Sequence, residues 1–182
     1  MNKPIFIVET DNVCYNVAKA VTENLNKALG RNYTELEFYG DRFKSDIKEN
    51  YEDTISAAIV AAHTEGIVEY RDGGLKLEET LCKHRVISTT LDMAYSTKYK
   101  IPENLMAECD EPVVYIGTNY EMCVRMPADL KILVKFDVDH KKNRIVGNED
   151  NFYVVNTLDE VEQIIDFYSE HPEMIPFTRG VV

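Results

Sequence analysis

Basic residues are scarce in this sequence. Its 182 residues include 20 Lys and Arg against 32 Asp and Glu, which leaves a formal net charge of −12. Nucleic acids and anionic membrane surfaces bind proteins through basic patches, so neither is expected as the main partner. Long apolar runs are also missing, since no stretch approaches the roughly 18 apolar residues that a membrane-spanning helix requires.

Clustered metal ligands and cysteine pairs are missing too. The histidines form no His-x-x-x-His pair, and the cysteines show no Cys-x-x-Cys spacing, so we expect neither a zinc site nor a disulfide scaffold. The four cysteines are Cys14, Cys82, Cys109 and Cys123. Reduced thiols at these positions predict a cytoplasmic protein. The first nine residues hold one Lys before a short apolar run, which is typical of a strand and not of a signal peptide.

What the chain does have is an alternation of apolar runs and helical patterns. Short apolar runs predict strands at 4–8, 85–89, 112–116, 130–136 and 152–155. Between them, apolar residues at three- and four-residue steps predict helices over 13–29, 55–62 and 75–83, and a last one after Thr157, which forms a capping-box pattern with Glu160. Strands separated by helix-length segments predict an α/β fold, with a parallel sheet and helices on both faces.

Three of these predicted strands end in polar residues. Glu9 and Asp11 follow the first strand, Ser88 and Thr89 end the second, and Thr118 and Asn119 follow the third. Ligands bind beyond the carboxyl ends of the strands in open parallel sheets, so these side chains are expected to converge on one crevice. Strands also commonly end in polar turn residues for purely structural reasons.

The order of these strand ends resembles the haloacid dehalogenase superfamily. That superfamily begins with a hydrophobic strand and D-x-D-G-[V/T]. A second strand ending in Ser or Thr follows, then a Lys, then a strand ending in Gly-Asp or Asp-Asp. The matching segments here are I-F-I-V-E-T-D-N-V (Ile5–Val13), R-V-I-S-T (Arg85–Thr89) and V-V-Y-I-G-T-N-Y-E-M (Val113–Met122). The chain is most similar to the small 5'(3')-deoxyribonucleotidase-type members, which carry a helical cap after the first motif. The resemblance implies a Rossmannoid core at 1–13 and 81–182 and a helical cap at 14–80.

The resemblance also implies roles for individual residues. The catalytic positions would be Glu9 (nucleophile), Asp11 (acid/base), Ser88 or Thr89 (hydroxyl), and Lys98 or Lys100 (lysine). Ligand contacts would come from Asn12, Thr118 and Asn119. Asn12 stands where the superfamily has Gly, and Thr118 stands where it has a metal-binding Asp.

Two departures from the superfamily pattern bear on activity. Glu9 is one methylene longer than the expected Asp, and a shift of about 1 Å in the attacking oxygen can cost ~10²-fold in rate. Thr118 offers a neutral hydroxyl where magnesium prefers a carboxylate. We therefore expect a catalytically degenerate, nucleotidase-like protein that needs no cofactor and binds a small phosphorylated ligand or a protein with a basic face. The alternative is an active phosphatase acting on nucleoside monophosphates, with magnesium held by Glu9, Asp11 and Glu121.

Overall fold

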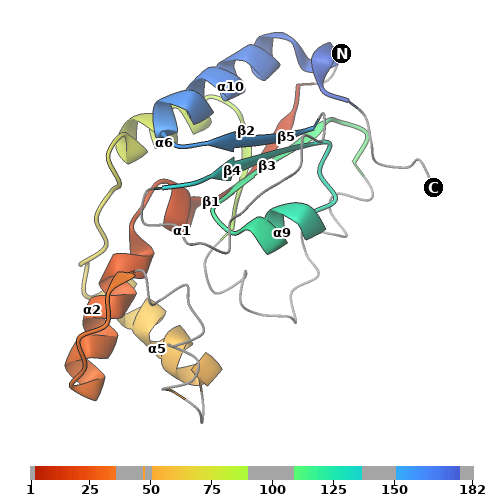
Figure 1. The fold of residues 1–182 in the computed structure, drawn as a ribbon. Coiled ribbons are helices and arrows are strands. Elements are labelled where there is room, and N and C mark those ends of the chain that lie inside the picture. The colour runs from red at the N-terminus through yellow and green to blue at the C-terminus, as the bar shows by residue number, and fades with distance from the viewer. Residues whose placement is uncertain (1–2, 36–46, 48–50, 90–108, 137–150, 177–182) are drawn as a thin grey trace.

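A five-stranded parallel sheet forms the centre of the protein. The structure, a computed structural model, describes residues 3–35, 47, 51–89, 109–136 and 151–176. The strands are β1 (Ile5–Glu9), β2 (Arg85–Thr89), β3 (Val113–Gly117), β4 (Leu130–Val134) and β5 (Phe152–Val155), in the order β2-β1-β3-β4-β5 (Figure 1). Every pairing between them is parallel. The predicted α/β fold is confirmed, and β1 lies between β2 and β3.

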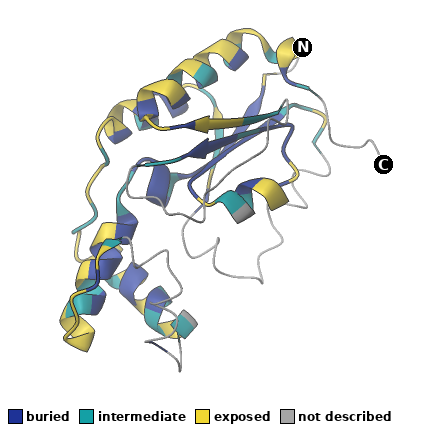
Figure 2. Ribbon diagram, in the orientation of Figure 1, coloured by how far each residue is buried: buried dark blue, intermediate teal, exposed yellow. Residues whose placement is uncertain are grey.

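Helices cover both faces of this sheet. On one face, α6 (Gly74–Leu81) and α10 (Leu158–Glu170) bury Leu77 and Ile165 against the sheet residue Ile116. On the other face, α9 (Tyr120–Arg125) buries Cys123 against Tyr115. The side chains of β1 and β3 are buried along their whole length, which is why both strands read as continuous apolar runs in the sequence (Figure 2).

A second apolar cluster joins two helices that lie away from the sheet. Residues of α2 (Val17–Leu29), such as Leu25, pack against residues of α5 (Tyr51–Thr64), such as Ile59 (Figure 1). This helical pair lies within the segment 14–80 expected as a cap. The end of that segment includes most of α6, however, and α6 packs with α10 on the sheet. The division into a core and a cap at residues 14–80 stays a prediction.

The helix expected over 13–29 is broken near its start, so that prediction was wrong. A short helix α1 (Thr10–Val13) follows β1, and α2 begins only at Val17, capped by the Asn16 side chain. Between them, the Asn16 amide donates to the carbonyl of Glu69 (2.8 Å), and the Arg71 amide donates to the carbonyl of Cys14 (2.9 Å). These bonds join residues 14–16 to residues 69–71, the two segments that connect the sheet to α2 and α5. They take the place of the backbone hydrogen bonds that a continuous helix would form there.

The helix ends follow the sequence signals more closely. Gly30 ends α2 in the left-handed conformation (φ 62°), and Thr157 and Glu160 form the predicted capping box at the start of α10. After α10, a 3₁₀ turn (Pro172–Met174) leads to Ile175, which is buried in the core. Within the described ranges, we find no helix with both the length and the apolar character needed to cross a membrane.

Candidate functional site

The candidate site lies where the strand order changes direction. The chain goes from β1 to β2 on one side and to β3 on the other, so the topological switch point falls between β1 and β3. Ligands in open α/β sheets bind at this point, beyond the carboxyl ends of the strands. Glu9 ends β1, Thr89 lies beside it in register on β2, and Thr118 follows the end of β3. The structure thus brings together the three strand ends that the sequence singles out.

Glu9 is fully engaged by protein donors. Its Oε1 accepts a hydrogen bond from the Asn12 side-chain amide (2.9 Å). Its Oε2 accepts two more, from the Thr118 backbone N–H (3.0 Å) and from the Thr118 hydroxyl (3.2 Å). The residue is only 2% exposed. The carboxylate therefore ties the end of β1 to the end of β3 at the switch point, where a ligand is expected to bind.

Burial also changes the acidity of this carboxyl group. Removal from water raises the pKa of Glu9 above its ordinary value of 4.5, and the bonds from Thr118 and Asn12 oppose this rise without cancelling it. The negative charge of Asp11 raises the pKa of Glu9 slightly further. A carboxyl group that holds its proton more tightly, with both oxygens already bonded, is a poor nucleophile.

Asp11 lies beside Glu9 but faces the helical pair. It is 5% exposed, and its Oδ1 lies 3.7 Å from Nε2 of His63, which comes from the last turn of α5. His63 is half-exposed, so the contact lies at the rim of the crevice. No sequence signal pointed to His63, because its approach to Asp11 depends on how α5 is placed against α1.

The hydroxyl-bearing residues of β2 differ in their exposure. Thr89 is buried, and its hydroxyl donates to the backbone carbonyl of Val8 (3.3 Å). Ser88 is exposed on the edge strand. Of this pair, Thr89 faces inward, with its hydroxyl bonded to the neighbouring strand.

The remaining predicted residues are placed as follows. Asn119 caps α9, since its side-chain oxygen accepts from the Met122 backbone N–H (3.2 Å). Glu121 lies in α9, but its side chain is not among those described. Lys98 and Lys100 fall outside the described residues. Among the groups that are described, no cluster of three His, Cys, Asp or Glu side chains could hold a metal ion.

Arg71 lies in the connection between α5 and α6, and no sequence pattern singled it out. Its Nε donates to the backbone carbonyl of Asn12 (2.7 Å), and one Nη lies 3.3 Å from a carboxylate oxygen of Glu35. Its guanidinium group also lies over the Phe136 ring, 4.1 Å from the ring centroid. Arg71 therefore joins α1, the segment after α2 and the segment after β4, which are far apart in the sequence.

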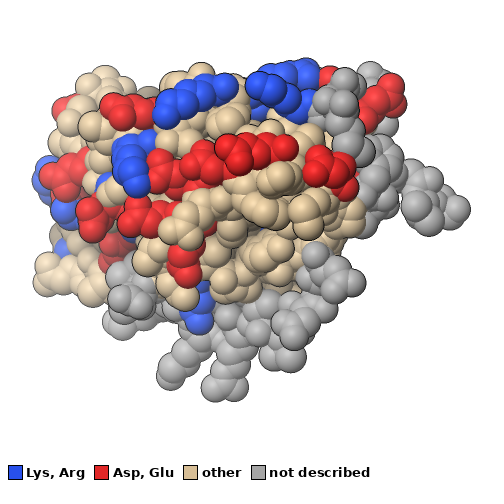
Figure 3. Space-filling view, turned by 90° about the horizontal axis from the view of Figure 1, so that it is seen from above, with Lys and Arg blue, Asp and Glu red and all other residues tan. Residues whose placement is uncertain are grey.

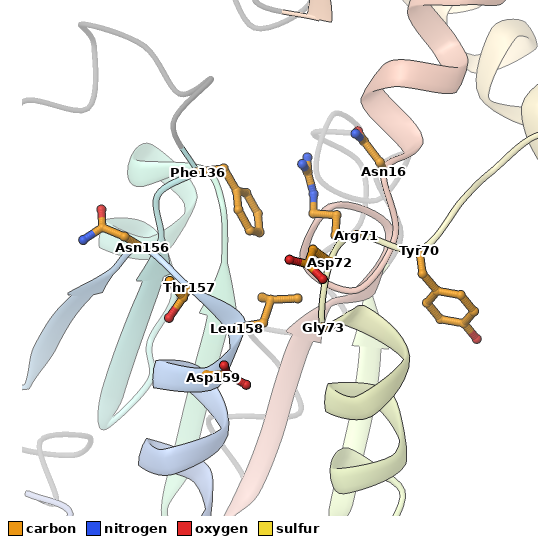
Figure 4. A pocket seen from close by; sticks show the side chains of 10 residues that line it. All are labelled: Asn16, Tyr70, Arg71, Asp72, Gly73, Phe136, Asn156, Thr157, Leu158 and Asp159. Atoms are coloured by element: carbon orange, nitrogen blue, oxygen red, sulfur yellow. The ribbon is translucent and has the colours of Figure 1, made fainter.

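A cavity of about 470 Å³ adjoins Arg71 at the carboxyl ends of β4 and β5. Figure 4 shows Phe136 and Leu158 on one side of the cavity, facing Arg71 and Asp72 on the other. Its size falls within the range of small-molecule sites, roughly 300–1,000 Å³. Asp72 belongs to the Asp-Gly-Gly turn of the sequence, but no sequence pattern relates this turn to Phe136.

Comparison with known proteins bears on the fold. No family model matches the chain, and no match was found among curated proteins. A solved structure titled "Structural characterization of the Mycobacterium tuberculosis Protein Tyrosine Kinase A (PtkA)" is similar, with a TM-score of 0.59 and 12% sequence identity. The alignment covers 91% of this chain and 99% of that one. At this identity the likeness shows the fold alone.

Proposed function

We propose that this chain is a catalytically inactive, phosphatase-like α/β protein that acts by binding. The observation that carries the proposal is the engagement of Glu9, the residue at the nucleophile position of the superfamily it resembles. Both of its carboxylate oxygens accept hydrogen bonds from Asn12 and Thr118, and the side chain is buried. An attacking oxygen must be free to approach phosphorus, so the reaction would first have to break these bonds.

Breaking these bonds would be costly. A buried polar group that loses its partner costs about 1–3 kcal/mol, and Thr118 would lose its acceptor together with Glu9. The described residues also do not fit magnesium, because Glu9 has no free oxygen and Thr118 contributes no charge where the superfamily has a carboxylate. These two features support a binding role over the alternative of an active phosphatase.

We propose a small phosphorylated ligand, or a protein with a basic face, as the binding partner. The net charge of −12 favours a partner with a basic face and opposes binding to nucleic acid or an anionic membrane. For the small ligand, the donors would be backbone N–H groups after Asp11, the Ser88 hydroxyl, the Thr89 hydroxyl once it exchanges its bond to Val8 for one to the ligand, and Lys98 or Lys100. We further propose a cytoplasmic location, with the four cysteines kept as thiols, in line with the lack of any disulfide among them.

A turnover assay tests the catalytic half of the proposal. Purified protein with magnesium should release no more than trace phosphate from an aryl phosphate or from deoxynucleoside monophosphates. Asp11→Asn is the matched variant, because it removes the acid/base position and keeps the side-chain shape. Robust magnesium-dependent turnover that Asp11→Asn abolishes would overturn the proposal in favour of the active phosphatase.

Calorimetry tests the binding half. Each nucleoside monophosphate is titrated beside its parent nucleoside, so that the two ligands differ only in the phosphate. Heat with the monophosphate and none with the nucleoside is expected if the crevice recognises phosphate. The absence of heat with every monophosphate at millimolar concentration would favour the protein partner instead.

A further inference from the structure

The strand β5 forms one edge of the sheet, and its outer side is open among the described residues. Its inner side pairs with β4: the carbonyl of Asn151 accepts from the Lys131 amide (2.8 Å), and that of Val155 from the Lys135 amide (2.7 Å). Backbone groups of a strand point alternately to its two sides. Phe152 and Val154 therefore direct their N–H and C=O groups away from the sheet.

The side chains along this edge are apolar and uncharged. The strand reads Phe-Tyr-Val-Val and has no Lys, no other charge and no Pro, which are the usual features that keep an exposed edge from pairing. Tyr153 is 38% exposed and Val154 is 42% exposed. Figure 2 shows the middle of β5, where these two residues lie, as exposed.

A groove continues from this strand onto α10. It has a volume of about 370 Å³, and its lining combines the apolar Ile164 and Phe167 and the aromatic Tyr153 with the polar Glu160 and Gln163. Phe167 is 44% exposed, so its ring is accessible to a partner at the strand edge. The opposite edge of the sheet differs, because β2 carries the exposed Arg85 and Ser88.

We propose that β5 pairs antiparallel with β5 of a second copy of this chain, so that two sheets join into one across a two-fold axis. Two residues exchange backbone hydrogen bonds only if both point toward the partner strand, so the outward-pointing residues exclude every register that is shifted by one residue. Among the registers that remain, we propose the one centred on Tyr153. Phe152 then faces Val154 of the second copy, Val154 faces its Phe152, and each facing pair exchanges both of its bonds. Tyr153 faces Tyr153 on the axis.

This register suits the side chains. Aromatic residues opposite β-branched residues, and aromatic residues opposite each other, are favourable cross-strand pairs. Phe152 opposite Val154 is a pair of the first kind, and Tyr153 opposite Tyr153 is a pair of the second kind. Tyr153 lies on the α10 side of the sheet, where its hydroxyl contacts that of Tyr168 (2.9 Å), so the partner ring can occupy the groove beside Phe167.

A second copy can occupy this edge because the strand itself carries no charge. Two chains of net charge −12 repel each other over most of their surface and can approach closely only where charge is missing. Figure 3 shows a row of Asp and Glu side chains across the α10 side of the molecule, with an uncharged area beside it. The four residues of β5 are uncharged, and Asn151 and Asn156 flank them. When the two-fold axis passes through Tyr153, no charged residue of one strand therefore faces a like charge on the partner strand.

Sedimentation of the full chain, from low micromolar to submillimolar concentration, tests this dimer. The wild-type protein is expected to reach the mass of two chains. Tyr153→Glu places two carboxylates opposite each other on the axis and should weaken dimerisation by at least about tenfold. Val60→Glu is the matched control, because it adds the same charge at an exposed apolar residue of α5, away from the sheet, and should leave the dimer intact.

A second variant guards against a folding defect in the first. Val154→Pro removes one outward N–H group and leaves the bonds to β4 in place, as is tolerated on edge strands, so it should give a folded monomer by circular dichroism. A wild-type protein that stays monomeric at every concentration would overturn the proposal. So would a dimer that withstands both Tyr153→Glu and Val154→Pro, or one that Val60→Glu disrupts.

Discussion

The carboxylate of Glu9 accepts hydrogen bonds from both the backbone N–H and the hydroxyl of Thr118, at 3.0 and 3.2 Å. One residue ends β1 and the other follows β3, so these bonds close the switch point of the sheet at its carboxyl edge. In the superfamily that the sequence resembles, both positions hold Asp and serve catalysis. Here the longer carboxylate and the neutral hydroxyl bond to each other instead.

Replacing Thr118 by Val tests the contribution of the hydroxyl to stability. The variant keeps the side-chain shape and the backbone N–H bond, but it removes one donor from a buried carboxylate. We expect a loss of about 1–3 kcal/mol in the free energy of unfolding, measured by urea denaturation. Thr64→Val is the control, because the Thr64 hydroxyl bonds to a backbone carbonyl at an exposed position, and its loss should be small. Equal losses in the two variants would contradict a special role for Thr118.

The raised pKa of Glu9 predicts how stability depends on pH. The folded state holds the proton more tightly than the unfolded chain, in which the pKa is near 4.5, so folding takes up protons. The contribution of Glu9 to stability is therefore fully present below about pH 4.5 and is lost as pH rises through the folded-state pKa. Glu9→Gln cannot titrate. The unfolding free energy of wild type minus that of Glu9→Gln should thus fall as the pH rises above about 4.5, and an increase over that range would show that the pKa is lowered.

Arg71 is predicted to stabilise the protein more than a surface arginine does. Its side chain is only 10% exposed, and it bonds to Asn12, pairs with Glu35 and stacks on Phe136. Among the described residues, Arg71→Ala leaves the largely buried Glu35 carboxylate with only the 3.4 Å bond from the Asn16 side chain, so we expect a loss of about 3 kcal/mol by chemical denaturation. Arg85 is 59% exposed, so Arg85→Ala removes a pair with Glu111 that water screens and should cost much less. Similar losses for the two arginines would contradict the assignment.

Restoring the acidic residues is predicted to restore catalysis only in combination. Glu9→Asp alone shortens the carboxylate but leaves the metal position neutral, so turnover should stay at trace level. Glu9→Asp with Thr118→Asp supplies both carboxylates and should give measurable, magnesium-dependent phosphate release. Glu9→Asp with Thr118→Asn is the matched control, because it has nearly the same shape without the charge. Robust turnover by Glu9→Asp alone would show that the neutral residue at the metal position is not what prevents catalysis.

Sequence patterns alone predicted the elements and much of their arrangement. Periodicity and apolar runs located the five strands and the helix α10, and Gly30, Thr157 and Glu160 marked helix ends through purely local bonds. The parallel order followed because helix-length connections force parallel strands, and the polar ends of β1, β2 and β3 then had to meet at one edge. These features depend on local conformation and on chain connectivity, which a sequence displays directly.

The contacts of the residues at the switch point could not be predicted from the sequence, because they form between separate elements. Nothing local to Glu9 predicts that its carboxylate meets Thr118, because that contact depends on the lengths of two strands and on their register. The break after Val13, the approach of His63 to Asp11, and the stacking of Arg71 on Phe136 have the same origin. Each joins residues from separate elements, and their side chains meet only after the helices have packed on the sheet and on each other.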